Sequence, residues 1–239
     1  MRMNGKKDGV LMVCYACLLV IGGLLTWLKY DYNTVKMEDV REACGYVSAS
    51  ATSVEAPEIA LTFDDGPSAA WTPALLDGLK ERGVKATFFL IGENADKNPE
   101  IVKRMAEEGH LIGNHTYHHV ELTKVTEKEA RSELADTSAA IVRITGKEPE
   151  YMRPPFGAWQ RKLEQEIRML PVLWTIDPLD WTTENQDEIV NKVVTEAEEN
   201  DIILLHDCYK SSVEAGLRIV DILQEEGFVF VTVDELLLN

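Results

Sequence analysis

The chain has 239 residues, enough for one domain with an extension or for two small domains. It is 45% apolar and 27% charged and contains no low-complexity tract, which excludes an intrinsically disordered protein. The net charge of −17 belongs to residues 57–239, because the first 56 residues hold as many basic as acidic side chains. A surface this acidic repels a phosphate backbone, so nucleic acid is excluded as a partner.

The N-terminal residues 1–28 have the pattern of a membrane anchor. Residues 10–28 carry no charge, and as a helix they would span about 28 Å, close to the thickness of a bilayer's hydrocarbon core. Basic residues precede this run, so the positive-inside rule puts the N-terminus in the cytoplasm and the rest outside. A cleaved signal peptide, which would give a secreted protein, is the alternative, but no small-residue cleavage site follows Leu28. The sequence therefore predicts one transmembrane helix that anchors the chain in the cell membrane.

The next segment, residues 29–56, is polar and ends in a run of small residues, as a stalk or linker does. Cys44 in this stalk and Cys208 further on would both lie outside the membrane, which leaves a disulfide between them open. The cysteine spacing matches no zinc finger. The oligomeric state is equally open. Residues 57–239 remain as the folded domain.

Within this domain, short β-rich runs alternate with amphipathic helical runs. The predicted strands are residues 59–63, 84–91, 171–176, 202–205 and 228–233, with a further strand end at Tyr151. The predicted helices are residues 73–82, 99–108, 126–145, 186–198 and 213–225, and the third of them begins with the capping box Thr126-Glu127-Lys128-Glu129. Such alternation indicates an α/β fold with a mostly parallel sheet, closed as a barrel or open and doubly wound.

Two adjacent carboxylates, Asp64 and Asp65, follow the first predicted strand, and Gly66-Pro67 turns the chain directly after them. Neighbouring carboxylates at a strand end can divide two roles, because one can bind a cation while the other stays free as a base. An ordinary Asp-Gly turn, in which the aspartate bonds its own backbone, is the alternative.

Four of the five histidines fall within ten residues, and three of them are close enough in sequence to bind the same metal ion. His115 and His119 are four residues apart, which lets two imidazoles converge from one face of a helix. His115 and His118, three apart, could converge as well, and spacing alone does not choose between the pairs. Histidines without any metal are the remaining alternative.

Three further segments carry polar groups at predicted strand ends. Arg153 opens a Pro-Pro-Phe-Gly loop, where a guanidinium can hold a carboxylate by two hydrogen bonds. The segment Asp177-Pro178-Leu179-Asp180-Trp181 follows the strand at residues 171–176. His206 ends another strand, where it can act as a general acid oriented by a carboxylate from a second loop.

In order and spacing, these segments together resemble the polysaccharide deacetylase family, the NodB-homology domain of carbohydrate esterase family 4. The matching motifs are Thr62-Phe63-Asp64-Asp65-Gly66-Pro67, His115-Thr116-Tyr117-His118-His119, Arg153-Pro154-Pro155-Phe156-Gly157, Asp177-Pro178-Leu179-Asp180-Trp181 and Leu204-Leu205-His206. The resemblance covers residues 57–238. It implies an irregular (β/α)7-type barrel, so residues 57–239 are the predicted catalytic domain.

Carried over residue by residue, the resemblance implies a divalent cation held by Asp65, His115 and His119, with water completing the coordination. The cation is most often Zn²⁺ in such a site, with Co²⁺ or Ni²⁺ as alternatives. Asp64 would be the general base, and Arg153 would hold it in place and keep it ionised.

The resemblance implies that His206 is the general acid and that Asp180 orients it. It assigns four further residues to the substrate: Pro155, Phe156, Trp181 and Leu204. Trp181 and Leu204 would form an apolar wall beside the acetyl group.

The implied function is metal-dependent N-deacetylation of N-acetylglucosamine residues in a cell-wall or exported polysaccharide, with release of acetate. Peptidoglycan is the favoured substrate, because an anchor and a short stalk would keep the domain near the wall. An O-acetyl esterase acting on xylan-like polysaccharide and a non-catalytic glycan-binding protein are the alternatives. The sequence contains each catalytic residue that the family motif requires, which disfavours the second of these.

Overall fold

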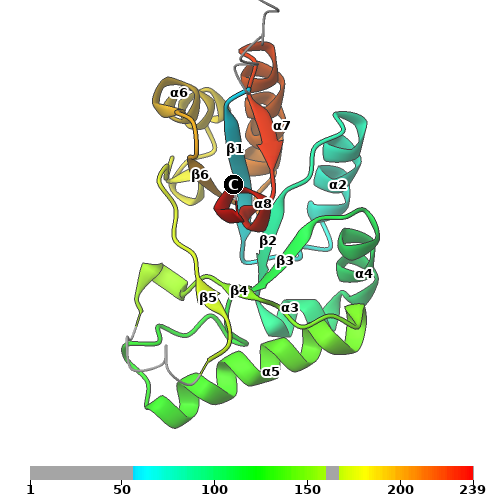
Figure 1. Cartoon of the computed structure of the whole chain (residues 1–239), viewed down its shortest axis with the longest axis vertical. Coiled ribbons are helices and arrows are strands. Elements are labelled where there is room, and N and C mark those ends of the chain that lie inside the picture. The colour runs from blue at the N-terminus through cyan, green and yellow to red at the C-terminus, as the bar shows by residue number, and fades with distance from the viewer. Residues whose placement is uncertain (1–55, 160–166, 239) are drawn as a thin grey trace, which may run out of the picture. The chain divides into compact units, whose positions relative to one another are not determined.

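A sheet of seven parallel strands forms the centre of the fold in the computed structural model, which describes residues 56–159 and 167–238 (Figure 1). The strands are β1 (Glu58–Asp64), β2 (Thr87–Leu90), β3 (Leu111–Asn114), β4 (Tyr151–Met152), β5 (Leu170–Pro171), β6 (Ile202–His206) and β7 (Val229–Val231). Their order is β5-β4-β3-β2-β1-β6, and β7 pairs with the start of β1. Because every pairing is parallel, the carboxyl ends of the strands gather at one edge.

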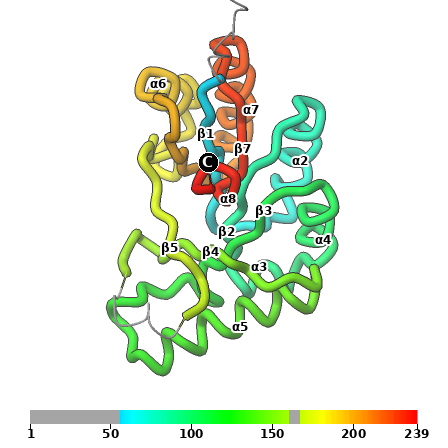
Figure 2. Tube along the Cα trace, viewed as in Figure 1, coloured from blue at the N-terminus to red at the C-terminus, as the bar shows by residue number. Residues whose placement is uncertain are grey.

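The connections between the strands are mostly helical and lie on the outside of the sheet. The helices are α2 (Thr72–Glu81), α3 (Gly92–Lys97), α4 (Pro99–Glu107), α5 (Glu127–Thr145), α6 (Gln186–Glu196), α7 (Lys210–Glu225) and α8 (Val233–Leu238), with 3-10 turns η1 (Pro155–Gly157) and η3 (Asp180–Thr182). Figure 2 shows α6 and α7 beside β6 and β1, whereas α5 lies at the end of the sheet near β4 and β5. Contacts of α5 with α3, α4 and β3 hold that end together.

Apolar residues of the central strands are buried on both faces, as parallel sheets require. In β2, Phe88 and Leu90 belong to the main core, whereas Phe89 between them belongs to a second cluster with Ala60 and Tyr151. The period of two along the strand thus divides its side chains between two cores. The second cluster is the small interior of a curled sheet, which confirms the α/β class and the barrel-like curvature expected from the sequence.

The prediction of a continuous strand at residues 171–176 is wrong. Leu170 and Pro171 pair with β4, and the segment regains sheet pairing only at Ile176, which bridges to Ile203 of β6. The carbonyl oxygens of Val172 and Leu173 accept hydrogen bonds from the Arg153 guanidinium, so a side chain takes the place of a neighbouring strand. Among the described residues, the barrel is therefore a curled sheet whose closure depends on one bridge and one buried side chain.

Helix ends agree well with the capping signals in the sequence. The capping box that begins α5 is confirmed: the Thr126 hydroxyl accepts from the Glu129 backbone N–H, and the Glu129 carboxylate accepts from the Thr126 N–H at 2.9 Å. The helix ends at Gly146, whose φ of 74° suits a residue without a side chain. The predicted helices at 73–82, 99–108 and 186–198 differ from α2, α4 and α6 by at most two residues at either end.

Two short helices were not predicted. The predicted strand at residues 228–233 ends at Val231, and α8 begins at Val233. The Thr232 backbone N–H donates to the Glu235 carboxylate at 2.9 Å, which is half of a capping box. This Thr-x-x-Glu signal was present but lay inside a β-branched run. The other helix, α3 (six residues), is too short to show helical periodicity.

No helix in the described part of the chain has the length and apolar composition needed to cross a membrane. The predicted anchor at residues 10–28 lies outside the described residues, as does nearly all of the predicted stalk. Cys44 also lies outside them, so the pairing with Cys208 is not tested.

Replacing Thr126 with alanine removes the side-chain acceptor of the α5 capping box. We expect a loss of about 0.5–2 kcal/mol in the free energy of unfolding, measured by urea denaturation. Thr123→Ala is the matched control, because Thr123 lies in an exposed turn and caps no helix. Equal stability of the two variants would contradict the capping role.

Candidate active site

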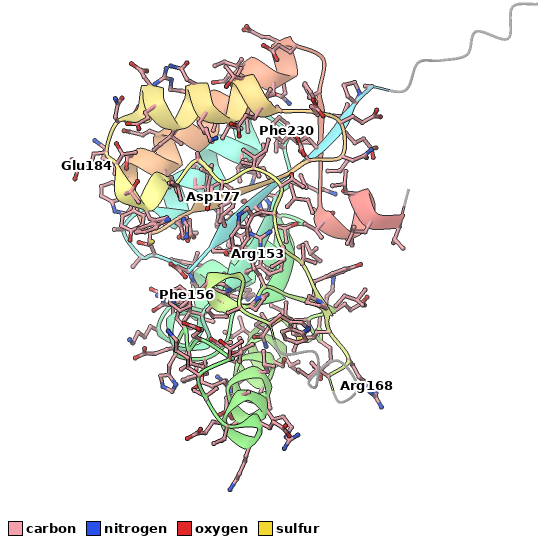
Figure 3. The ribbon with its side chains drawn as sticks, turned by 90° about the vertical axis from the view of Figure 1, so that its left-hand side faces the viewer. Arg153, Phe156, Arg168, Asp177, Glu184 and Phe230 are labelled. Atoms are coloured by element: carbon pink, nitrogen blue, oxygen red, sulfur yellow. The ribbon has the colours of Figure 1, made fainter. Side chains whose placement is uncertain are left out.

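A cavity of about 400 Å³ lies at the carboxyl ends of β1 and β6. Figure 3 shows two of its lining residues, Phe156 and Asp177, on the same side of the ribbon. The complete lining consists of Asp64, Asp65, His115, His119, Phe156, Trp174, Asp177, Leu179, Trp181, Leu204, His206 and Tyr209. All five sequence motifs therefore contribute side chains to one cavity. Arg153 is not part of the lining but binds Asp64 from behind.

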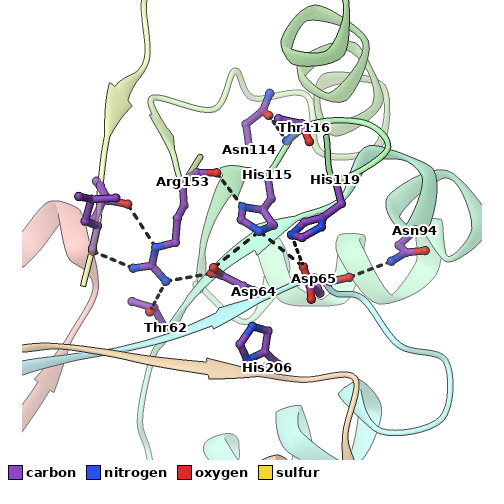
Figure 4. Close-up of polar contacts among 12 residues, drawn as sticks. Thr62, Asp64, Asp65, Asn94, Asn114, His115, Thr116, His119, Arg153 and His206 are labelled. Atoms are coloured by element: carbon purple, nitrogen blue, oxygen red, sulfur yellow. Dashed lines mark hydrogen bonds and ion pairs between the residues drawn. The ribbon is translucent and has the colours of Figure 1, made fainter. Parts of the chain in front are cut away.

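Asp65, His115 and His119 form the one cluster of three potential metal ligands within the described ranges, with ligand atoms within 4.8 Å of one another. Nε2 of His115 lies 3.5 Å from Asp65 Oδ1, and Nε2 of His119 lies 3.3 Å from the same oxygen. Figure 4 shows the two imidazoles turned toward Asp65. His118 instead contacts Glu133 at 2.9 Å and is exposed, so the structure selects His119 over His118.

The local conformation behind this selection differs from the helix that the histidine spacing suggested. Residues 115–119 form a loop after β3, and Thr116 and His119 both have a left-handed backbone, with φ of 63° and 55°. The two left-handed residues turn His119 back toward His115, and the ring centroids come within 5.0 Å. The pair at i and i+4 converges, but not because it shares a helical face.

The geometry and polarity of this cluster fit a divalent cation. Asp65 Oδ1 is buried and has no hydrogen-bond partner, an arrangement that is costly for a carboxylate unless a cation satisfies it. Nδ1 of His115 lies 2.7 Å from the backbone carbonyl of Arg153, so Nδ1 carries the proton and Nε2 faces Asp65 with its lone pair. Burial lowers the pKa of His115 to about 3, which keeps the ring neutral. One carboxylate and two neutral imidazoles are a ligand set that suits zinc.

Asp64, next to this cluster, is held by a buried ion pair. Its Oδ1 accepts from Nη1 of Arg153 at 2.9 Å, and its Oδ2 lies 3.7 Å from Nε2 of His115. Burial raises the pKa of Asp64, while the charges of Arg153 and His206 oppose that rise. The carboxylate is thus a stronger base than an exposed aspartate, and it has one oxygen not used by Arg153.

Arg153 is fully buried, and each of its contacts serves the site (Figure 4). Beyond Asp64, Nη1 donates to the Thr62 hydroxyl at 2.7 Å, and the guanidinium donates to the carbonyls of Val172 and Leu173. The planar cation also lies 4.3 Å above the ring of Phe89. A buried guanidinium with every edge occupied is rigid, so it fixes the position of the carboxylate that it binds.

His206 and Asp180 form the second polar pair of the cavity. Nδ1 of His206 lies 2.7 Å from Asp180 Oδ1, and the His206 backbone N–H donates to Oδ2 at 2.8 Å. Burial lowers the pKa of His206, but the hydrogen bond and charge of Asp180 and the nearby Asp64 more than offset this and raise it to about 9. His206 is the register partner of Asp64 on the adjacent strand, so a carboxylate and a protonated imidazole stand side by side.

Of the four residues assigned to the substrate, three line the cavity. Phe156 is 66% exposed, and its ring lies 4.8 Å from that of His119. Trp181 is also exposed, whereas Leu204 is buried at the floor. Pro155 is buried in η1 and is not part of the lining.

Sequence reasoning missed several residues that shape the site. Trp174 and Tyr209 line the cavity, and each comes within a few residues of a predicted strand end, which is the signal that could have identified them. Asp207 is buried beneath the site, where it accepts from the Thr72 hydroxyl and leaves no room for a side chain at Gly66. It thereby links the end of β6 to the turn that follows Asp65.

Comparison with known proteins agrees with this geometry. A family model described as polysaccharide deacetylase matches residues 51–173. A peptidoglycan-N-acetylglucosamine deacetylase of Bacillus cereus is 43% identical over 78% of this chain and 70% of its own length. The peptidoglycan-N-acetylglucosamine deacetylase PgdA of Listeria monocytogenes is 38% identical over 84% of this chain, which spans only 45% of that relative.

A solved structure of the peptidoglycan deacetylase PdaC of Bacillus subtilis matches with a TM-score of 0.75 and 40% identity, over 76% of this chain and 90% of that one. PdaC is named as a peptidoglycan-N-acetylmuramic acid deacetylase. The fold and site thus define a hydrolase domain that is built on a curled parallel sheet and has a candidate metal cluster. The chain belongs to the polysaccharide deacetylase family.

Replacing Asp180 with asparagine removes the charge that keeps His206 protonated. In metal-depleted protein, we expect the pKa of His206 to fall from about 9 by about 1–3 pH units, measured by NMR titration of the imidazole. A raised folded-state pKa stabilises the protein below the unfolded value of 6.5, and this stabilisation is lost as the pH rises through about 9. Asp180→Asn should therefore destabilise the fold more at pH 6 than at pH 10, and an unchanged His206 titration would refute the pairing.

Proposed function

We propose that this protein is a peptidoglycan deacetylase that removes the N-acetyl group from N-acetylglucosamine residues and releases acetate, with a bound divalent cation. The observation that carries the proposal is the position of a buried carboxylate, Asp64, and an imidazole, His206, on adjacent strand ends beside a cluster of residues that can bind a metal. The relatives in Bacillus cereus and Listeria monocytogenes are named for this substrate. N-Acetylmuramic acid, which is named for PdaC, is the second candidate sugar.

Asp65, His115 and His119 would hold the cation, and Zn²⁺ is the proposed metal because the set has one oxygen and two nitrogen ligands. When bound there, the cation would polarise the acetyl carbonyl and make water more acidic. The proton on Nδ1 of His115 is held by the Arg153 carbonyl, so Nε2 stays available as a ligand.

Asp64 is the proposed general base. Its raised pKa strengthens it as a base. The ion pair with Arg153 fixes Oδ1, whereas Oδ2 lies 3.7 Å from Nε2 of His115 and is not bound by Arg153. As the water oxygen bonds to the acetyl carbon, Asp64 would take a proton from that water. The orientation of the Asp64 carboxylate therefore matters for this proton transfer as much as its charge.

His206 is the proposed general acid. A pKa of about 9 means that the imidazole carries its second proton at neutral pH, and Asp180 fixes Nδ1 so that Nε2 faces the cavity. As the bond between the carbonyl carbon and nitrogen breaks, His206 would give its proton to the nitrogen, which leaves as a free amine. The second product is acetate.

The proposal includes the location of the protein. The uncharged run at residues 10–28 supports a single membrane anchor with the catalytic domain outside the cell, or a secreted domain if the run is cleaved. Membrane fractionation of cells that express the full chain tests this, because recovery in the cytosolic fraction would contradict both forms.

Acetate release from purified peptidoglycan and from N-acetylglucosamine oligomers tests the proposed reaction. We expect chelation to abolish release and added Zn²⁺ to restore it, because the ligand cluster would be empty after chelation. Release that persists after chelation would contradict the metal requirement. Acetate from acetylated xylan but from neither N-acetyl substrate would make the protein an O-acetyl esterase instead.

Substitutions at two sites separate the base from the ligands. Asp64→Asn should retain zinc but lower kcat by about 10²–10⁴-fold, because proton transfer is lost while the ligands remain. His115→Ala should lose zinc as measured by elemental analysis. His118→Ala is the matched control from the same motif, because its side chain is exposed and points to Glu133, and it should keep both zinc and activity. Full activity of Asp64→Asn would overturn the assignment of the base.

A further inference from the structure

The loop at residues 115–119 supplies two of the three residues that can bind a metal, and its backbone is strained. Thr116 and His119 have φ of 63° and 55°, a left-handed conformation that is unfavourable for residues with a side chain. This conformation turns His119 back toward His115, so that their rings lie 5.0 Å apart. A strained conformation persists only where surrounding groups fix it, so the groups that bind this loop also set the geometry of the cluster.

The carbonyl groups of the loop are bound by the start of α3. The Thr116 carbonyl accepts from the Gly92 N–H at 3.0 Å. The Tyr117 carbonyl accepts from the Glu93 N–H at the same distance. Both bonds join main-chain groups and hold one edge of the loop. The N–H groups of the loop need acceptors of their own, because an unpaired backbone donor is costly in a partly buried segment.

One side chain, Glu133 of α5, supplies the acceptor for the two central N–H groups. Its Oε2 accepts from the Tyr117 N–H at 2.9 Å and from the His118 N–H at 2.8 Å. Its Oε1 lies 2.9 Å from Nδ1 of His118. Two consecutive N–H groups that converge on one carboxylate oxygen form an anion-binding concavity in the backbone, and the negative charge strengthens both bonds. Glu133 therefore binds the loop midway between His115 and His119.

The helix that carries Glu133 is itself fixed to the start of the loop. The Glu133 side chain is 15% exposed, and the next residue, Leu134, is buried. The Leu134 carbonyl accepts from Nδ2 of Asn114 at 2.8 Å, and Oδ1 of Asn114 accepts from the Thr116 N–H at 2.9 Å (Figure 4). The loop is thus attached to α5 at its start through Asn114 and at its middle through Glu133.

The two candidate histidine ligands depend on these attachments to different degrees. His115 is at the end of β3, and its ring is oriented by the Arg153 carbonyl at 2.7 Å. His119 has no comparable contact of its ring nitrogens with the backbone, since Nε2 faces Asp65 at 3.3 Å. Its position therefore follows from the backbone of residues 116–118, which is the part that Glu133 binds.

We propose that Glu133 is a positioning residue for the metal cluster, whose carboxylate holds the left-handed loop so that the His119 and His115 rings both face Asp65. This proposal rests on the proposed metal-dependent function and adds to it a residue that touches neither the cation nor the glycan. Without the carboxylate, the loop relaxes toward ordinary backbone conformations, His119 turns away from Asp65, and the affinity for the cation falls.

Zinc affinity, measured by competition with a chelator, tests the proposal separately from catalysis. Glu133→Ala should bind zinc about tenfold to a hundredfold more weakly than the native protein, as is typical when a group that orients a ligand is removed. Glu133→Gln keeps an oxygen that can accept from both N–H groups, so it should restore most of the affinity. Glu133→Asp keeps the charge but shortens the side chain, so it should also weaken binding.

Two controls separate positioning from other effects. His118→Ala removes the exposed ring that contacts Oε1 but leaves both bonds to Oε2, so zinc affinity should be unchanged. Thr126→Ala weakens the cap of α5 without touching the loop and should leave zinc affinity unchanged as well. Hydrogen exchange in metal-free protein checks the contact itself, because the Tyr117 and His118 amides should exchange faster in Glu133→Ala and stay protected in Glu133→Gln.

Three results would overturn the proposal: unchanged zinc affinity in Glu133→Ala, an equal loss in Thr126→Ala, or no recovery in Glu133→Gln. If Glu133→Ala does not fold, the comparison of Glu133→Asp with Glu133→Gln decides in its place. Acetate release from N-acetylglucosamine oligomers is measured in parallel. Glu133-dependent zinc affinity without acetate release would retain the positioning role and reject the deacetylase function, whereas acetate release with Glu133-independent affinity would do the reverse.

Discussion

The buried guanidinium of Arg153 is the interaction on which the described structure most depends. A cation without solvent costs several kcal/mol unless its partners satisfy it, and here those partners come from β1 and from the segment after β5. The side chain occupies a gap in strand pairing at Val172 and Leu173 and holds Asp64. Its backbone carbonyl orients His115. Closure of the curled sheet, placement of the carboxylate and orientation of an imidazole thus depend on one residue, which makes the site rigid as a consequence of the fold.

Parallel pairing of β1 with β6 gives the site its second organising constraint. The register sets Asp64 opposite His206, and their different partners separate their protonation states. Burial raises the pKa of Asp64 against the opposing charge of Arg153, whereas Asp180 keeps His206 protonated to about pH 9. A base and an acid can therefore coexist at neutral pH a strand's width apart. Two exposed aromatic residues stand beside this acid and its partner: Trp181 directly follows Asp180, and the Tyr209 ring lies 6.4 Å from the His206 ring.

Much of the fold could be predicted from local sequence signals, and the errors have different causes. The capping box at Thr126 was predicted correctly, since it involves residues three apart. The strand at residues 171–176 was not, because the backbone carbonyls at Val172 and Leu173 bond to Arg153, about twenty residues earlier in the chain. The helix α8 was hidden within a β-branched run although its Thr232 signal was present. Local propensity thus fails at residues 171–176 because a distant side chain supplies the hydrogen bonds, and at α8 because two local signals compete within one short run.

The sequence by itself determined the kinds of group in the site and their order: paired carboxylates, clustered imidazoles, an arginine before two prolines, and a histidine at a strand end. Only the tertiary structure decided between His118 and His119, because that choice depends on left-handed backbone at Thr116 and His119. It also decided that Asp180 meets His206 and that Tyr209 lines the catalytic cavity. The physical reason is that chain order sets which chemical groups are present, whereas distances between groups remote in sequence follow from strand register and backbone torsions. Neither of these can be read from residue types alone.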